Sequence, residues 1–279
     1  MSLRPAPVRR MSVRRNALIA ASAAMIGLSA CLDRMLEAPY VLATGLGEAK
    51  TISPWKGGFY VGGGSGVFEV AADGTARQVS SQPVDALTSL ADGWAAIQGD
   101  QLCTTAGRCL TVPGARDLAG WYGRELRVLA GDRVLAVPLC RFDAPDADGC
   151  PKGEYREIIG GLTGARGIAY GEGRRWLVWT DRDLIAVIEP EPASAAISRE
   201  VLWSGMTDPR AAGVDGKGRV FVVQGAEPAL YRVEGGGGVL SARWMEGVTD
   251  LYAGIEQGRL GDKLYLSSSA GKVVFLQPG

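Results

Sequence analysis

Cysteines are the residues of this chain whose type and spacing most clearly support chemistry. Cys31 follows an apolar stretch, and four others form two local pairs, Cys103 with Cys109 and Cys140 with Cys150, each of which brackets a polar turn. An even number of cysteines is typical of disulfides outside the cytoplasm. Zinc is the alternative, but zinc sites favour Cys-x-x-Cys spacing or histidine partners. We therefore expect the disulfides Cys103–Cys109 and Cys140–Cys150; cross-pairings would join separate repeats.

Absent residue types limit the chemistry further. The chain has no histidine, and its only asparagine is Asn16. Ser-His-Asp and Cys-His catalysis and the common histidine metal sites are therefore excluded. An acidic stretch, Asp143 to Gly149, resembles part of a calcium loop, but its spacing departs from that pattern and favours a solvated hairpin tip. From the sequence we assign no catalytic residue, no metal ligand and no cofactor.

Residues 1–30 have the composition of a secretory signal. Arginines without any acidic residue precede the apolar stretch 17–30, which is shorter than the about 20 residues that span a bilayer. The ending Leu28-Ser29-Ala30-Cys31 resembles the bacterial lipobox, in which the cysteine is acylated and becomes the N-terminus. The alternatives are an ordinary signal peptide with an incidental cysteine and a start at Met11.

The lipobox resemblance implies a lipid-anchored protein of the cell envelope. Acyl chains on Cys31 would attach it to the membrane, and residues 31–39 would form a short tether. Leu32 stands where an aspartate would hold many such proteins in the inner membrane, so we expect the outer membrane. With the five arginines of residues 1–30 set aside, 25 basic and 30 acidic residues remain. That balance does not indicate nucleic-acid binding, and we expect another envelope protein as partner.

A repeat runs through the rest of the chain. Similar glycine-containing linkers precede short apolar runs, at residues 45–52, 84–87, 114–119, 161–168, 205–212 and 247–253. Each linker is followed by strand-like runs separated by turns, in units of about 40 residues, as in four-stranded blades. The inner strands are expected to begin near Ile52, Leu87, Leu118, Ile168, Ala212 and Ala253.

Six such units predict an all-β, six-bladed β-propeller over residues 40–279. The last unit has room for only three strands, and residues 40–44 form an apolar strand without a blade, so this strand is expected to complete the sixth blade. Residues 165–170 and 209–223 resemble the repeats of NHL-type six-bladed propellers. That resemblance implies a fold and a binding face but names no ligand. A two-sheet sandwich is the alternative.

The position just before each inner strand carries charge. By the linker alignment it holds Lys50, Asp85, Arg116, Arg166, Arg210 and Leu251. Lys50, Arg116, Arg166 and Arg210 would form a positive collar at the channel mouth that receives an anionic ligand or an acidic partner segment. Alternatively, these cations pair with neighbouring acids such as Glu48, Asp117, Asp208 and Asp250 and connect adjacent blades.

Related six-bladed propellers include calcium-dependent lactonases of the gluconolactonase type, whose central metal is held by Glu, Asp and Asn side chains. The expected mature chain lacks asparagine, and we find no carboxylate that recurs at the inner-strand starts. The sequence therefore favours a non-enzymatic, lipid-anchored binding or scaffolding propeller. The alternative is a metal-dependent hydrolase or lactonase with a carboxylate-only site.

Overall fold

The computed structural model describes most of the chain after residue 39. The described residues are 40–55, 57–122, 125–143, 150, 153, 155–171, 175–190, 196–242, 247–256 and 259–276. The predicted signal peptide, Cys31, the tether and the acidic residues 144–149 lie outside them. Within the described ranges, no helix is long and apolar enough to cross a membrane.

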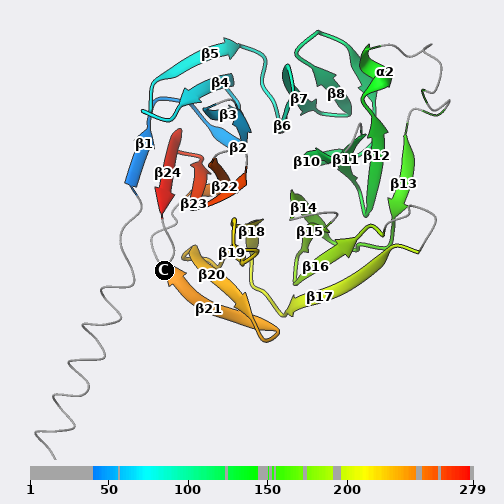
Figure 1. The fold of residues 1–279 in the computed structure, drawn as a ribbon, viewed down its shortest axis with the longest axis vertical. Helices are drawn as coiled ribbons and strands as arrows, with labels where there is room; N and C mark the ends of the chain where they lie inside the picture. The colour runs from blue at the N-terminus through cyan, green and yellow to red at the C-terminus, as the bar shows by residue number, and fades with distance from the viewer. Residues whose placement is uncertain are drawn as a thin grey trace, which may run out of the picture. The chain divides into compact units, whose positions relative to one another are not determined.

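Six four-stranded antiparallel sheets form a ring (Figure 1), which confirms the predicted six-bladed β-propeller. In each blade the strand nearest the ring centre precedes the next two in the chain. The outermost strand of blade 6 comes from the N-terminal end of the domain. Blade 1 contains β2 (Ala49–Trp55), β3 (Gly58–Gly63), β4 (Gly66–Ala71) and β5 (Ala76–Ser80). Blade 2 contains β6 (Ala86–Leu90), β7 (Gly93–Gln98), β8 (Gln101–Thr104) and β9 (Cys109–Thr111). Blade 3 contains β10 (Ala115–Tyr122), β11 (Glu125–Ala130), β12 (Arg133–Pro138) and β13 (Arg156–Ile159).

The second half of the ring repeats this order. Blade 4 contains β14 (Ala165–Tyr170), β15 (Arg175–Thr180), β16 (Asp183–Ile188) and β17 (Ser198–Ser204). Blade 5 contains β18 (Pro209–Val214), β19 (Val220–Gln224), β20 (Ala229–Glu234) and β21 (Gly237–Ala242). Blade 6 contains β22 (Val248–Glu256), β23 (Arg259–Ser268), β24 (Lys272–Leu276) and β1 (Tyr40–Ala43).

The two ends of the domain close the ring, as the sequence predicts. β1 pairs with β24 in antiparallel register, with Tyr40 opposite Phe275 and Val41 opposite Val274. The Tyr40 and Phe275 rings stack with centroids 5.4 Å apart. The closure therefore joins the first strand of the domain to its last.

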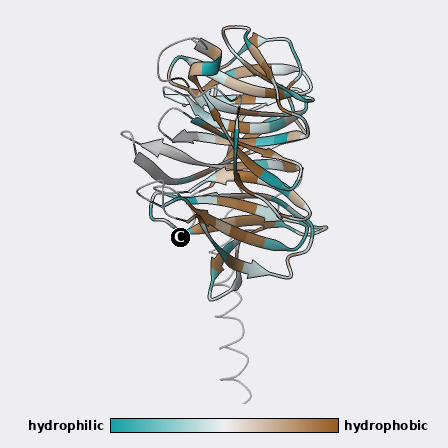
Figure 2. Ribbon diagram, turned by 90° about the vertical axis from the view of Figure 1, so that its right-hand side faces the viewer, coloured by the Kyte–Doolittle hydropathy of each residue, from teal (hydrophilic) through white to brown (hydrophobic). Residues whose placement is uncertain are grey.

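Apolar side chains of facing blades fill the space between the sheets. The buried residues fall into six clusters, one for each interface between neighbouring blades. Hydrophobic residues run along the strands in Figure 2. Packing of this kind explains why tryptophans recur in the blades: Trp94, Trp176 and Trp179 are all buried core residues.

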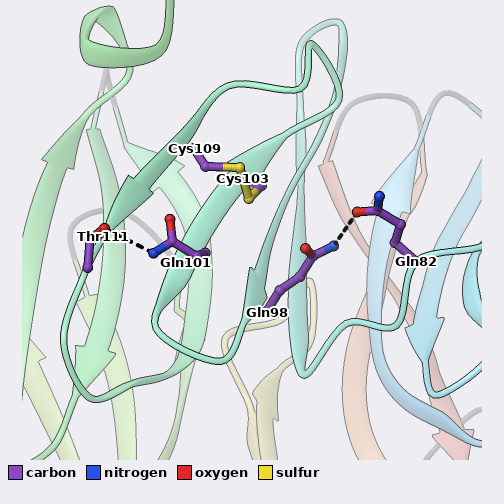
Figure 3. The surroundings of a disulfide bond; sticks show 6 residues. All are labelled: Gln82, Gln98, Gln101, Cys103, Cys109 and Thr111. Atoms are coloured by element: carbon purple, nitrogen blue, oxygen red, sulfur yellow. Dashed lines mark hydrogen bonds between the residues drawn. A yellow bond between two sulfur atoms is a disulfide. The ribbon is translucent and has the colours of Figure 1, made fainter.

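Both predicted disulfides are present. Cys103 and Cys109 lie directly opposite each other on β8 and β9 (Figure 3). Cys140, at the start of the short helix α2 (Cys140–Asp143), is bonded to Cys150. Near the first disulfide, Gln101 Nε2 donates to Thr111 Oγ1 at 2.9 Å, which connects the same two strands.

Candidate active site in the central channel

The inner strands of five blades begin with an irregularity that sets the direction of their first side chains. In β2, β10, β14, β18 and β22 the register shifts between the first and third residues, so one extra residue bulges from each strand. The bulged residues are Lys50, Arg116, Arg166, Arg210 and Thr249. In blade 6 the sequence alignment expects Leu251 just before the inner strand, but the register places Thr249 at this position. Leu251, rather than Ala253, is therefore the equivalent of Ile52.

The residue that follows the bulge reaches toward the next blade. This position is occupied by Thr51, Asp117, Gly167, Ala211 and Asp250, and by Ala86 in β6. Going around the ring from blade 2, the residue types read Ala, Asp, Gly and then Ala, Asp, Thr. The two aspartates are therefore three blades apart and lie on opposite sides of the channel.

Asp117 connects blade 3 to blade 4 through backbone amides. Its Oδ1 accepts from the Leu118 amide at 2.9 Å, and its Oδ2 accepts from the Ile168 amide at 2.8 Å. Ile168 belongs to the inner strand of the next blade. One carboxylate therefore satisfies two inner-strand N–H groups that the sheet ladders leave free.

Asp250 repeats this arrangement between blade 6 and blade 1. Its Oδ1 accepts from the Leu251 amide at 2.8 Å, and its Oδ2 accepts from the Ile52 amide at 2.9 Å. The Thr51 hydroxyl also donates to Oδ2, at 3.1 Å. The bulged neighbour Thr249 adds a bond from its hydroxyl to the Ala49 carbonyl at 2.9 Å.

Blade 4 fills the corresponding space with a ring instead of a carboxylate. A Cβ placed on Gly167 would lie 2.0 Å from Cζ2 of Trp179, so only glycine fits beneath the indole. Trp179 is buried and packs against blade 5, next to Ala212 and Met206. The channel wall is therefore polar at two opposite sides and apolar at blade 4.

The two carboxylates face one cavity of about 220 Å³ at the ring centre. The cavity lining comes from all six inner strands. Asp117, Asp250 and the hydroxyl residues Ser53, Thr88 and Ser89 are among its polar residues. Tyr170 contributes an aromatic side chain to the same wall. The dimensions suit a small molecule or ion, because small-ligand sites are typically concave and lined by apolar residues with a few convergent polar groups.

Burial raises the pKa values of both carboxyl groups. Desolvation raises the pKa of Asp117 well above its ordinary value, the charge of Asp250 raises it further, and the amide donors Ile168 and Leu118 oppose that rise. Desolvation also raises the pKa of Asp250 to about 6, against the opposing effect of donors from Ile52, Leu251 and Thr51. At pH 7 Asp250 is therefore mostly ionised, and the pKa of Asp117 is held well above its usual range.

The predicted collar residues lie at the mouth, and most of them are paired with acids. Lys50 Nζ lies 2.9 Å from Asp85 Oδ1. Arg166 bonds to Asp181 at 2.5 Å and to Asp208 at 3.1 Å.

Two further collar arginines differ from each other. Arg210 Nη2 lies 3.2 Å from Asp208 Oδ2, so Asp208 connects the cations of blades 4 and 5. Arg116 is exposed and has no ion pair among the residues that the structure describes. Three of the four cations thus have the acid-paired arrangement that the sequence left open as the alternative. Whether the collar receives an anion stays a prediction.

Sequence reasoning missed the two channel carboxylates. From the sequence, Asp117 and Asp250 are expected only as acids that pair with collar cations. The expectation that no carboxylate recurs at the inner-strand starts is wrong, because both acids follow the bulged residue of their strands. The signal was present: both acids follow a bulged residue and precede a leucine. The alignment of the six linkers places Asp117 and Asp250 at equivalent positions once Thr249 is aligned with Arg116.

Comparison with known proteins supports the fold. No protein-family model matches the sequence, and no match was found among curated proteins. The chain is similar in structure to a gluconolactonase from Xanthomonas campestris, with a TM-score of 0.62 and 13% identity over 85% of this chain and 88% of that chain. A calcium-binding protein, regucalcin, from Agrobacterium tumefaciens gives 0.59 and 16% over 86% and 94%.

A third similar structure, a protein of unknown function from Bacteroides thetaiotaomicron, gives a TM-score of 0.57 and 9% identity over 85% of this chain and 71% of that chain. At these identities the likeness shows the shared fold, a six-bladed β-propeller like those of gluconolactonase and regucalcin. It does not distinguish NHL-type repeats from other six-bladed propellers.

The channel has oxygen donors of the kind that a hard divalent cation prefers. Carboxylate and hydroxyl oxygens suit calcium, and a cation between Asp117 and Asp250 would relieve the repulsion between the two acids. Each carboxylate oxygen has a second lone pair beyond its amide donor. Among the described residues, however, no group of three or more His, Cys, Asp or Glu side chains could hold a metal ion. The donor types therefore suit a hard cation, but within the described residues at most two carboxylates and neighbouring hydroxyls could contribute to holding it.

Proposed function

We propose that this protein is a hydrolase of the cell envelope that takes a small lactone or related ester into its central channel. The observation that carries this proposal is the pair Asp117 and Asp250, two carboxyl groups with raised pKa values on opposite sides of one cavity. Pairs of carboxyl groups whose surroundings shift their pKa values are typical of acid–base catalysis. The name of the gluconolactonase neighbour supports the same class.

The two acids have different roles in this proposal. Asp250 is mostly ionised near neutral pH and accepts a proton from the attacking water. Asp117, whose raised pKa favours its protonated form, donates a proton to the leaving oxygen. Their backbone donors hold each carboxylate in a fixed orientation across the cavity.

A divalent cation would add to this chemistry. Asp117, Asp250 and the hydroxyl groups of Ser53 and Ser89 are the residues that would hold it, and in that metal-bound form Asp117 would be an ionised ligand rather than the proton donor. When bound, such a cation supplies Lewis-acid polarisation of the ester carbonyl. Ser53 and Ser89 are already oriented toward each other, with their hydroxyl oxygens 3.3 Å apart.

The test is a panel of lactones and aryl esters, assayed with added calcium and with a chelator. Asp250→Asn should lower kcat/KM by about 100-fold or more, because it removes the proposed base. Asp132→Asn, a change of an exposed aspartate in the β11–β12 turn, is the matched control and should leave turnover unchanged. Metal analysis of the purified domain accompanies the assay. Hydrolysis that survives Asp250→Asn, or no hydrolysis of any substrate, would overturn the proposal.

A non-enzymatic binding propeller is the second candidate. The observation that favours it is that all four oxygens of the two carboxylates accept backbone N–H groups, as purely structural connections between blades would. In this case the panel gives no turnover and the purified domain carries no stoichiometric metal. Capture of an envelope protein from the protein's own membrane, lost on mutation of channel-mouth residues, would support this candidate.

Lipid anchoring at Cys31 remains part of the proposal. Its support is the sequence Leu28 to Cys31 after a basic and apolar leader. Cys31→Ser should leave the precursor uncleaved or release the mature domain from the membrane. Unchanged processing and membrane fractionation would contradict the anchor.

A further inference from the structure

A second concave region lies away from the channel, between blades 4 and 5. This groove has a volume of about 580 Å³. Its lining consists of Arg175, Glu200, Val201, Leu202, Gly218, Arg219, Val220, Arg232, Val233, Glu234, Gly235 and Gly236. Arg175 and Val220 begin the second strands of their blades, where the inner strands have already run away from the mouth. The groove is therefore on the face opposite the mouth.

Two of the three groove arginines are neutralised by acids of their own blade. Arg219 Nε lies 2.7 Å from Oδ2 of Asp215, a fully buried carboxylate. Arg232 Nε lies 2.5 Å from Glu234 Oε1, an ion pair by distance although the angles are not those of a hydrogen bond. These pairs are local and leave little charge for a ligand.

The remaining arginine and glutamate are different. The Nε of Arg175 is buried and has no hydrogen-bond acceptor among the described residues. Glu200 is exposed on β17, and within the described ranges neither residue has an ion pair with N···O of 4.0 Å or less. One positive and one negative charge therefore face the same groove without neutralising each other.

The groove lining also includes exposed apolar surface. Val201 is 55% exposed, although it is a β-branched residue in the middle of a strand. A Cβ on Gly235 or Gly236 would meet no atom within 4 Å, so the rim leaves space for a ligand. A volume of this size is typical of a site for a molecule larger than an ion.

We infer that this groove binds a zwitterionic ligand, specifically a short peptide with free termini. The peptide carboxylate is bound by Arg175, whose planar guanidinium suits two parallel hydrogen bonds to a carboxylate. The peptide ammonium is bound by Glu200. Side chains of the peptide cover Val201. This site is independent of the channel and of the activity proposed for it.

Calorimetry with the dipeptide Ala-Ala tests the inference on the purified domain. Ala-Ala should bind, and both N-acetyl-Ala-Ala and Ala-Ala amide should bind at least tenfold more weakly, because each blocked form lacks one charge. Arg175→Gln and Glu200→Gln should each weaken Ala-Ala binding by at least tenfold. Arg199→Gln, a change of a neighbouring exposed residue of β17 outside the groove lining, is the control and should bind as the wild type does.

Several results would overturn the inference. One is the absence of Ala-Ala binding to a wild-type domain that melts cooperatively. Another is equal binding of the free and the blocked dipeptides, and a third is unchanged affinity in both variants. Because Glu200 is exposed, Glu200→Gln should fold even if Arg175→Gln does not. Lactone hydrolysis, if present, should be unaffected by either variant, so failure here is distinguishable from failure of the proposed channel activity.

Discussion

Charged side chains near the ring axis have different partners at the channel mouth and in the channel wall. At the mouth, exposed cations pair with exposed acids, as Arg166 and Arg210 do with Asp208. In the wall, one residue further along each strand, Asp117 and Asp250 bind only backbone amides and a hydroxyl group. Exposed pairs are weak because water screens them, whereas unsatisfied amides in the wall are costly. The difference indicates that the wall stabilises the ring and the mouth contributes little.

Removal of a wall carboxylate should have the largest effect. Asp117→Ala leaves the amides of Leu118 and Ile168 without their acceptor, and we expect the free energy of unfolding to fall by about 2–4 kcal/mol. The raised pKa of Asp117 disfavours its charged form in the wall, so the variant relieves little charge burial and the loss of the acceptor is the larger effect. Urea unfolding measures the change, with Asp132→Ala as the control. A loss as small as the control's would show that water replaces the carboxylate.

The pH dependence of stability tests the same wall. Asp250 has a folded pKa of about 6, against about 3.9 for an aspartate in an unfolded chain. Between these values the folded state binds more protons than the unfolded state, so stability should rise as the pH is lowered from 7 to 5. For one such group the slope cannot exceed about 1.4 kcal/mol per pH unit.

Urea unfolding at pH 5, 6 and 7 measures that slope, and Asp250→Asn should flatten it. Acids at the mouth act with the opposite sign. The pKa of Asp85 is lowered, first by its bond from Lys50, so its contribution is present above about pH 4 and is lost at lower pH. The two effects therefore occupy separate pH windows. A wild-type free energy of unfolding that rises from pH 5 to pH 7 would contradict the raised pKa of Asp250.

A smaller effect is expected from the mouth itself. Asp208→Asn removes the acid shared by Arg166 and Arg210, and we expect a loss of about 0.5–1 kcal/mol that disappears at high salt. Asparagine is chosen because residue 208 has a φ of 47°, a left-handed conformation that asparagine tolerates. Thermal melts at low and high salt measure the change. A loss comparable with that of Asp117→Ala would remove the distinction between mouth and wall.

Arg116 should matter least for stability. It is exposed and has no ion pair among the described residues, so Arg116→Gln should change the free energy of unfolding by no more than about 0.5 kcal/mol. Chemical denaturation measures this value. If the collar captures an anionic ligand, the same variant should weaken that capture, whereas a large loss of stability would reveal a structural role.

The ring could be predicted from the sequence because its sequence pattern is local and repeated. Linkers, turns and apolar strands recur in each blade, and residues 40–44 were recognisable as the strand that the last blade lacked. The hairpin disulfides were predictable for the same reason, since their partners are close in sequence.

The site was harder to predict because its chemistry depends on one register shift. A bulge at the start of β10 decides that Arg116 lies at the mouth and Asp117 in the wall. Composition cannot show that shift. Nor could it show that Trp179 occupies the space above Gly167, which leaves no room for a carboxylate in blade 4.

The pairing of Tyr40 with Phe275 has a consequence for how the protein is made. Contacts between residues this far apart in sequence form slowly, because the loop that joins them must close first. The ring cannot close until the last strand is available, so an emerging chain keeps its sixth blade incomplete. If residues 1–30 act as the proposed export signal, the chain crosses a membrane before it folds, and late closure would keep it unfolded long enough to do so. Moving β1 to the C-terminal end by circular permutation should accelerate folding and reduce the amount exported.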